Sequence, residues 1–202
     1  MRLVLGSDLH GFLPEDIPCC DILIIAGDIL PDYNQADFML KNLPPWVEMA
    51  KSKATHVIAT WGNHDWLSFS GIVPKLDWNI LVEEAITIEG LKIYGSPWSL
   101  PFRKWAWMAP EKTLKRIYAT IPEDTDILIS HAPPLCICDR TESGEHVGSL
   151  ALKNRISELK NLKLVVCGHI HEARGRKGNV INASCLTANY QLRQNPWMVI
   201  SL

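Results

Sequence analysis

Five short polar segments of the sequence each follow an apolar run of the kind that forms a β-strand. They are Asp8-Leu9-His10, Gly27-Asp28, Thr60-Trp61-Gly62-Asn63-His64-Asp65, His131 and Gly168-His169-Ile170-His171. Alone, the third segment is best explained as a polar turn, because Gly62 permits positive φ and Asn63 and Asp65 can hydrogen-bond to nearby backbone. Polar side chains at the ends of five separate strands, however, indicate one shared site.

The five segments together offer carboxylate, amide and imidazole ligands and no thiolate. Hard oxygen combined with imidazole nitrogen suits Mn²⁺, Fe, Zn²⁺ or Ni²⁺, and the set contains too much nitrogen for Ca²⁺. Because the ligands are too many for one ion, we expect two divalent ions, with Mn²⁺ favoured, that share a bridging carboxylate. Water between two such ions has a lowered pKa and can attack as hydroxide. The net positive charge of this arrangement indicates an anionic substrate such as a phosphate ester.

Two pairs of these residues are separated by one intervening residue. Alternation along a strand places residues two apart on the same face. We therefore expect Asp8 and His10 to bind one ion together, and we expect His169 and His171 to lie on one side of their segment.

Length, charge and cysteine content limit the class of protein. A chain of 202 residues with a formal net charge of -2 is expected to form a single domain over residues 1–202. The absence of a basic block argues against an extended nucleic-acid footprint, although a small nucleotide remains compatible as substrate. The N-terminal apolar run is too short for a signal peptide or a membrane span, so we expect a cytoplasmic protein without a membrane partner.

The sequence contains six cysteines, which we interpret as reduced and mostly buried thiols. Cys136-Ile137-Cys138 could bind a soft metal, but no second cysteine pair follows at zinc-finger spacing.

Apolar periodicity predicts alternating strands and helices. Strands are expected over residues 2–7, 21–26, 55–60, 126–130 and 162–167. Helices are expected over residues 35–53, with an interruption at Pro44-Pro45, and over 110–120 and 149–159. Shorter runs are expected to form the hairpins of a second, antiparallel sheet, over residues 80–82, 85–89 and 91–94. Strands over residues 180–183 and 197–201 are expected to complete this second sheet.

In this order, the polar segments resemble the five sequence blocks of the calcineurin-like metallophosphoesterase superfamily. The resemblance covers nearly the whole chain. Residues 130–134, 168–175 and 181–184 are most similar to its small phosphodiesterase-like branch, which includes the brain metallophosphoesterase-domain proteins. The resemblance implies an α/β fold, a four-layer α-β-β-α sandwich with two mixed β-sheets.

The resemblance also implies a role for each block. The first ion would be bound by Asp8, His10 and His171. The second ion would be bound by Asn63, His131 and His169. Asp28 would bridge the two ions, and His64 would protonate the leaving group. The resemblance does not supply the residue that orients His64; Asp32 and the adjacent Asp65 are the two candidates, and the sequence does not choose between them.

One block departs from the pattern of the phosphoprotein phosphatases in this superfamily. In those enzymes an arginine that binds phosphate follows soon after the aspartate of the second block, whereas Asp28 is followed here by Ile29-Leu30-Pro31-Asp32. The residues that could contact substrate in its place are Arg103, Arg140, Arg174 and His146. For His146, a solvated position in a loop is the alternative that we favour.

The segment 98–108 carries four aromatic residues with Arg103 and Lys104 between them. These aromatic side chains either cap the core or cover a nucleotide-like substrate.

Three functions fit the sequence. A hydrolase of small phosphodiesters, such as cyclic nucleotides, is favoured. A phosphomonoesterase, or a nuclease that acts on short ends, is the alternative within enzymes. A catalytically silent scaffold is the third possibility, although the chain retains His64 and the ligand residues. The oligomeric state does not follow from the sequence.

Overall fold

The first sheet is built from short strands rich in isoleucine, leucine and valine, as expected for strands that are covered on both faces. In the computed structural model, which describes residues 1–71 and 76–202, its strand order is β11-β1-β2-β3-β4. The strands are β1 (Arg2–Gly6), β2 (Cys20–Ala26), β3 (Ala54–Thr60), β4 (Asn79–Ile80) and β11 (Met198–Ser201). β1 to β4 run parallel, and β11 pairs antiparallel with β1.

The second sheet has the order β5-β6-β7-β8-β10-β9 within the described residues. Its strands are β5 (Glu84–Ile88), β6 (Leu91–Ser96), β7 (Ile127–Ser130), β8 (Leu164–Cys167), β9 (Gly175–Lys177) and β10 (Val180–Asn182). The four inner strands are parallel, while β5 and β9 are antiparallel to their neighbours. Both sheets are therefore mixed.

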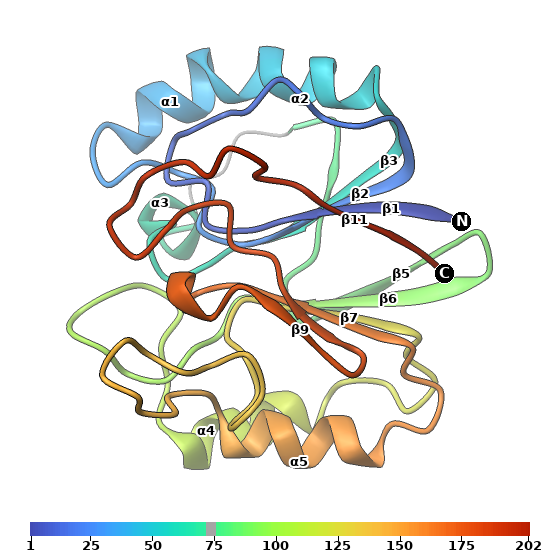
Figure 1. Ribbon diagram of the computed structural model, residues 1–202, viewed down its shortest axis with the longest axis vertical. Coiled ribbons are helices and arrows are strands. Elements are labelled where there is room, and N and C mark those ends of the chain that lie inside the picture. Colours follow the sequence, from blue (N-terminus) through green and yellow to red (C-terminus); the bar gives the residue numbers. More distant parts are fainter. Residues whose placement is uncertain (72–75) are drawn as a thin grey trace.

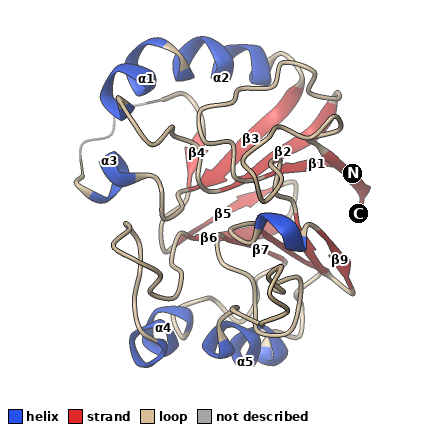
Figure 2. Cartoon of the chain, turned by 60° about the vertical axis from the view of Figure 1, so that its left-hand side comes forward, coloured by secondary structure: helices blue, strands red, loops and turns tan. Residues whose placement is uncertain are grey.

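Helices cover the outer face of each sheet, as Figures 1 and 2 show. α1 (Gln35–Lys41) and α2 (Leu43–Lys51) lie over the first sheet, and α4 (Glu111–Tyr118) and α5 (Leu150–Glu158) lie over the second (Figure 1). The short helices α3 (Trp66–Phe69) and η1 (His171–Ala173) lie in connecting segments. This arrangement confirms the expected four-layer sandwich.

The two sheets pack face to face through a buried apolar layer. Its residues include Leu5, Ile24, Ile58, Ile129 and Val166, all fully buried. Two further apolar clusters fill the space between each sheet and its helices. Because the inner strands of both sheets are buried on both faces, the polar side chains that follow them must gather at the strand ends.

The interruption expected at Pro44-Pro45 takes the form of two separate helices. α1 ends at Lys41, and α2 begins at Leu43 with a proline in its first turn. Proline is tolerated there because its missing N–H would have no partner within the helix.

Three expectations about strand pairing were wrong. Ile80 belongs to β4, which pairs parallel with β3 instead of forming a hairpin. The last strand, β11, joins the first sheet beside β1. The second sheet is mixed and not antiparallel, although its β5-β6 hairpin is present as expected. A strand's apolar pattern identifies its buried faces but does not identify its neighbour.

Among the residues that the structure describes, no helix is both long enough and apolar enough to cross a membrane.

Candidate metal centre

The polar segments at the ends of β1, β2 and β8 adopt backbone conformations that few residues other than glycine visit. φ is +55° at Asp8, +43° at His10, +51° at Asp28 and +67° at His169. Each such residue costs on the order of 1 kcal/mol or more, and strained residues of this kind tend to cluster at functional sites. Eight other non-glycine residues of the described chain also have positive φ, so a site is indicated here by four residues of metal-ligating types in this conformation at one edge of the sheets.

These conformations change the predicted geometry. β1 ends at Gly6, so Asp8 and His10 lie in a loop and do not alternate along a strand. They nevertheless lie close together. His169 and His171 do not alternate along a strand either, because β8 ends at Cys167 and φ of +67° at His169 turns the chain before η1 begins at His171. They belong to different ligand groups.

The structure brings six of the predicted ligands together in two groups. Within each group, one possible ligand atom from each residue lies within 4.8 Å of the others. The first group is Asp8, His10 and His171, and the second is Asp28, His131 and His169. This is the grouping that the family resemblance implies.

Asn63 extends the second group, and Asp28 connects the two groups. The Asn63 Oδ1 atom lies 2.9 Å from Nε2 of His131, so it belongs with the second group. The Asp28 Oδ2 atom lies 3.3 Å from Nε2 of His131 and 3.6 Å from Nε2 of His10. The carboxylate of Asp28 therefore lies between the two groups, at the place a bridging ligand would occupy.

Two imidazoles of the site have lowered pKa values, which favour the neutral ring. Burial lowers the pKa of His10 to about 4 and that of His169 to about 3. Both ring nitrogens of His10 are buried without a hydrogen-bond partner. Because a buried polar atom without a partner is costly, the neutral ring of His10 fits a metal ligand better than a core residue.

The Asp28–His131 pair of the second group differs from these two imidazoles, because here charge outweighs burial. Burial opposes ionisation of Asp28, but the adjacent His131 outweighs it and keeps the pKa of Asp28 well below its usual range. Burial likewise lowers the pKa of His131, but the Asp28 carboxylate outweighs this and raises that pKa to about 9. The anionic oxygens of Asp28 and the imidazole nitrogens around it are the donor types that Mn²⁺, Fe and Zn²⁺ accept. The residues present therefore fit two divalent ions.

Two glycines leave room for these carboxylates. A Cβ atom on Gly62 would fall on the Asp28 side chain, and a Cβ atom on Gly168 would fall on the side chains of Ser7 and Asp8. Both positions require glycine because a ligand carboxylate approaches the backbone there.

His64 lies beside the first group with its ring fixed on two sides. Its Nδ1 atom lies 2.7 Å from Oδ1 of Asp32, and its ring stacks on Trp105 with centroids 4.0 Å apart. One ligand atom each of His10, Asp32 and His64 also lie within 4.8 Å of one another. His64 therefore lies close to His10, which also belongs to the first group.

The prediction that Asp65 orients His64 was wrong. Its Oδ1 atom accepts hydrogen bonds from the backbone N–H groups of Ile29 and Leu30, and its Oδ2 atom accepts one from Gly62. Asp65 is fully buried and ties the loop after β2 to the loop after β3. Asp32, the other candidate, makes this contact instead; the sequence could not choose between them because Asp65 is adjacent to His64, whereas Asp32 follows the second block.

Of the arginines proposed to contact substrate, Arg174 is not available. Its Nη1 atom donates to the carbonyl oxygens of Ser184 and Pro196, and its Nη2 atom donates to that of Asn195. The prediction for Arg174 was therefore wrong, because three backbone carbonyls bind its guanidinium group. Arg103 is exposed, and its guanidinium carbon lies 5.2 Å from the centre of the Phe102 ring.

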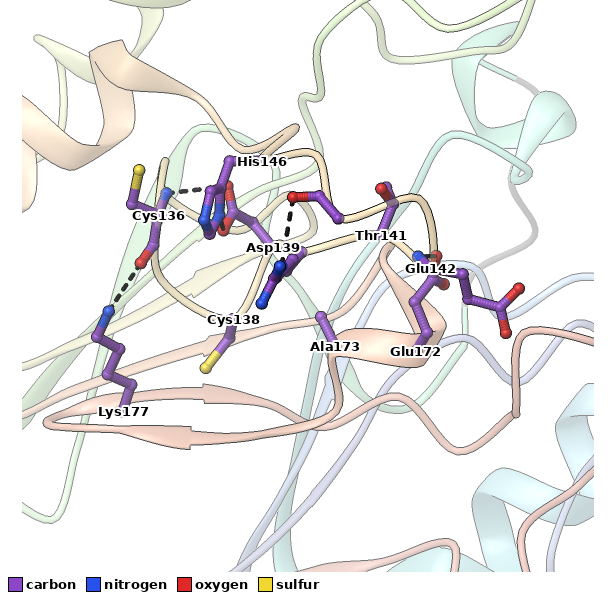
Figure 3. A pocket seen from close by; sticks show the side chains of 11 residues that line it. Cys136, Cys138, Asp139, Thr141, Glu142, His146, Glu172, Ala173 and Lys177 are labelled. Carbon is purple, nitrogen blue, oxygen red and sulfur yellow. Dashed lines mark hydrogen bonds and ion pairs between the residues drawn. The ribbon is translucent and has the colours of Figure 1, made fainter.

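Arg140 and His146 line a separate cavity, shown in Figure 3. His146 Nδ1 lies 2.7 Å from Oδ1 of the buried Asp139, and Arg140 Nε donates to the Gly144 carbonyl. No residue of the two ligand groups lines this cavity. Cys136 and Cys138 lie at its edge, and no metal-binding group found among the described residues contains a cysteine.

The aromatic segment 98–108 divides its side chains between packing and the site. Trp107 packs edge-on against Trp98, and its Nε1 atom donates to the Ser68 hydroxyl. Trp105 stacks on His64, while Phe102 lines a cavity next to His169. Both interpretations of the segment thus apply, to different residues.

Two residues near the first group were not predicted. The Tyr190 ring lies 4.9 Å from the His10 ring and 4.8 Å from the His171 ring. Arg193 donates through Nη2 to the carbonyl of His171 and so fixes the backbone of that ligand. Both residues lie between β10 and β11, in a segment without a recognisable motif. Their distance in sequence from the residues that they contact left no signal for predicting these contacts.

Comparisons with known proteins place the chain among phosphoesterases. A model of the family described as calcineurin-like phosphoesterase matches residues 1–173. Metallophosphoesterase domain-containing protein 1 from human and from mouse is 32% identical over 235 residues, which cover 100% of this chain and 71% of each relative. The crystal structure of phosphopantetheinyl hydrolase from Mycobacterium tuberculosis has a TM-score of 0.60 at 17% identity, covering 98% of this chain and 95% of that one. This last likeness shows a shared fold.

The role found for Asp65 predicts a large effect on stability. Asp65→Ala leaves three buried N–H groups without an acceptor, and we expect it to lower the free energy of unfolding by at least about 3 kcal/mol. Asp32→Ala is the matched control, because the Asp32 side chain is 43% exposed and contacts His64 instead of the backbone; a loss within about 1 kcal/mol is expected. Urea unfolding of both variants measures the difference. Equal losses would show that Asp65 does not anchor the two loops.

Proposed function

Because the chain belongs to the calcineurin-like phosphoesterase family, we propose that it is a metal-dependent hydrolase of small phosphodiesters. Family membership and the two ligand groups support a metal-dependent phosphoesterase. The choice of a diester rests on one observation, the scarcity of cations at the site. Arg174 is bound by backbone carbonyls, and Arg140 lines a separate cavity. A phosphodiester carries one negative charge, whereas a monoester carries nearly two close to neutral pH, so the diester matches this site better.

The ligand groups define where the phosphoryl group would bind. Asp8, His10 and His171 would bind one ion, and His131, His169 and Asn63 would bind the other, with Asp28 between them. When bound, two divalent ions supply a positive charge for the phosphoryl oxygens and lower the pKa of water. Mn²⁺ is our preferred metal, and Fe, Zn²⁺ and Ni²⁺ also suit these ligands.

His64 is our candidate for the proton donor. With Asp32 accepting from the Nδ1 atom, the Nε2 atom is left to carry the proton toward the leaving oxygen. The contact with Asp32 also holds the ring in one orientation, as a positioned general acid requires. Trp105 covers one face of the ring and limits its rotation.

The substrate that we favour is a small molecule, and nucleotides such as cyclic nucleotides are included. With a net charge of -2, the chain has no excess of positive charge for an extended nucleic-acid footprint. A phosphomonoesterase remains the alternative, and Arg103 is the residue that would supply its second positive charge.

The proposal predicts a preference between two esters that share a leaving group. Metal-loaded protein should hydrolyse bis(4-nitrophenyl) phosphate with a higher kcat/KM than 4-nitrophenyl phosphate. For each ester, kcat/KM is divided by the rate constant of its uncatalysed hydrolysis before the two are compared. Release of 4-nitrophenolate at one pH and one Mn²⁺ concentration measures both. A preference for the monoester of about tenfold or more, equivalent to about 1.4 kcal/mol of transition-state stabilisation, would favour the phosphatase alternative.

A second prediction separates the proton donor from a ligand. His64→Ala should lower kcat by about 10²- to 10⁴-fold, the usual contribution of general acid catalysis, while metal content is retained. His169→Ala is the comparison, and it should lower metal content. Elemental analysis of both purified variants provides the measurement. If both lose metal to the same extent, His64 is a ligand, as its proximity to His10 and Asp32 would permit.

A further inference from the structure

An apolar cavity opens directly beside two of the candidate ligands. Its volume is about 460 Å³, within the range of pockets that bind small molecules. It begins at His169 and His171 and extends between three segments that are distant in sequence. Its remaining lining residues are Leu100, Pro101, Phe102, Thr141, Val147, Ile170, Glu172, Ala188 and Tyr190. We call it the ester cavity.

The lining of the ester cavity favours an uncharged occupant. Among the residues that the structure describes, its lining contains aliphatic and aromatic side chains and no lysine or arginine. Its one carboxylate, Glu172, accepts a hydrogen bond from the backbone N–H of Glu142. A second phosphate group inside this cavity would lose water and lie near the Glu172 carboxylate, and Arg103, which lies over the exposed Phe102 ring, is held at the outer edge by that contact. The cavity therefore disfavours substrates with more than one phosphate group.

Two aromatic side chains give the cavity its shape. Phe102 is 58% exposed and Tyr190 is 44% exposed, so both rings offer apolar surface that the protein itself does not cover. The Tyr190 ring also contacts the rings of His10 and His171. A planar group that packs against Tyr190 would therefore lie next to the phosphoryl group bound at the ligand groups.

The position of the cavity determines which end of a substrate enters it. His64, Asp32 and Trp105 do not line it, whereas His169 and His171 do. The ring of Tyr190, which lines the cavity, lies 4.8 Å from the His171 ring and 6.4 Å from the His64 ring. The leaving group must be within reach of His64, so the cavity is placed for the other ester group, the one that stays on phosphorus.

We propose that the ester cavity binds an uncharged aromatic group on the retained side of a phosphodiester. This inference rests on the proposed function and narrows its substrate class to diesters with one phosphate and one planar aromatic substituent. Burial of that group against Phe102, Val147 and Tyr190 supplies the preference through the hydrophobic effect.

The test measures binding and hydrolysis separately. Phenylphosphonate and methylphosphonate carry the same charged group and differ in the group that would enter the cavity. Calorimetry with Mn²⁺-loaded protein should give a Kd about tenfold lower for phenylphosphonate, equivalent to about 1.4 kcal/mol. With 4-nitrophenolate as the leaving group of two diesters, the phenyl ester should likewise have a lower KM than the methyl ester.

Replacing one of two alanines, inside or outside the ester cavity, locates the effect. Ala188→Phe places a ring in the ester cavity and should reduce the ratio of the two Kd values to within about twofold of one. Ala119→Phe introduces the same side chain at an exposed position after α4, and it should retain the wild-type ratio. Thermal unfolding of both variants checks that they fold. If Ala188→Phe destabilises the protein, Ala188→Leu in the same assay decides.

The outcomes separate the two proposals. If phenyl and methyl compounds bind equally, or if the Ala188 variants keep the wild-type ratio, the ester cavity is not the binding site and this inference is wrong. If diesters are hydrolysed without a preference for phenyl, the proposed function stands and the cavity assignment fails. If the binding preference is present but no ester is hydrolysed, the cavity assignment stands and the proposed function fails.

Discussion

The Asp28 carboxylate is the group on which the arrangement of the site depends. It lies between His10 and His131, one from each ligand group, and it accepts a hydrogen bond of 2.7 Å from the backbone N–H of His64. It thus sets the positions of both ligand groups and of the candidate proton donor together. Its negative charge raises the pKa of His131, and its bulk requires glycine at position 62. The carboxylate of Asp28, a residue whose backbone has positive φ, therefore connects the loops after β2, β3 and β7.

The two-sheet architecture makes this connection possible. Parallel strands that are buried on both faces leave their polar continuations at one edge, and stacking two such sheets places two of these edges side by side (Figure 1). Asp65 and Asn182 then fix the loops from within. Asp65 binds three backbone N–H groups, and the Asn182 side chain donates to the carbonyl oxygens of Gly168 and Ile170. Neither residue needs to contact an ion to determine the geometry of the site.

The family resemblance predicted the fold class, and continuous apolar runs of four to seven residues predicted most of the strands that carry polar segments. It did not allow prediction of the partners of β4 and β11, because pairing is decided by packing between distant segments. The residues of the site were identifiable as types that bind metal, but strand alternation assigned His169 and His171 to the same side. That rule assumes extended backbone, and the positive φ of His169 violates it.

The same limit explains why Asp32 and Tyr190 could not be assigned beforehand. Asp32 is separated from His64 by a helical crossover, and Tyr190 comes from a polar segment without a motif. A hydrogen bond or ring contact across such distances in sequence depends on how the loops close over the strand ends. The arginines show the opposite case. A cation in a plausible block, Arg174, is used by the protein to bind its own carbonyl groups.

The number of ions bound by each folded chain tests the central claim most directly. Equilibrium dialysis of metal-free protein against Mn²⁺, followed by elemental analysis, should give about two ions per chain for the wild type. It should give fewer for Asp28→Ala, which lacks the carboxylate between the two ligand groups. A wild-type value of one or less, or an undiminished value for Asp28→Ala, would contradict a centre of two ions organised around Asp28.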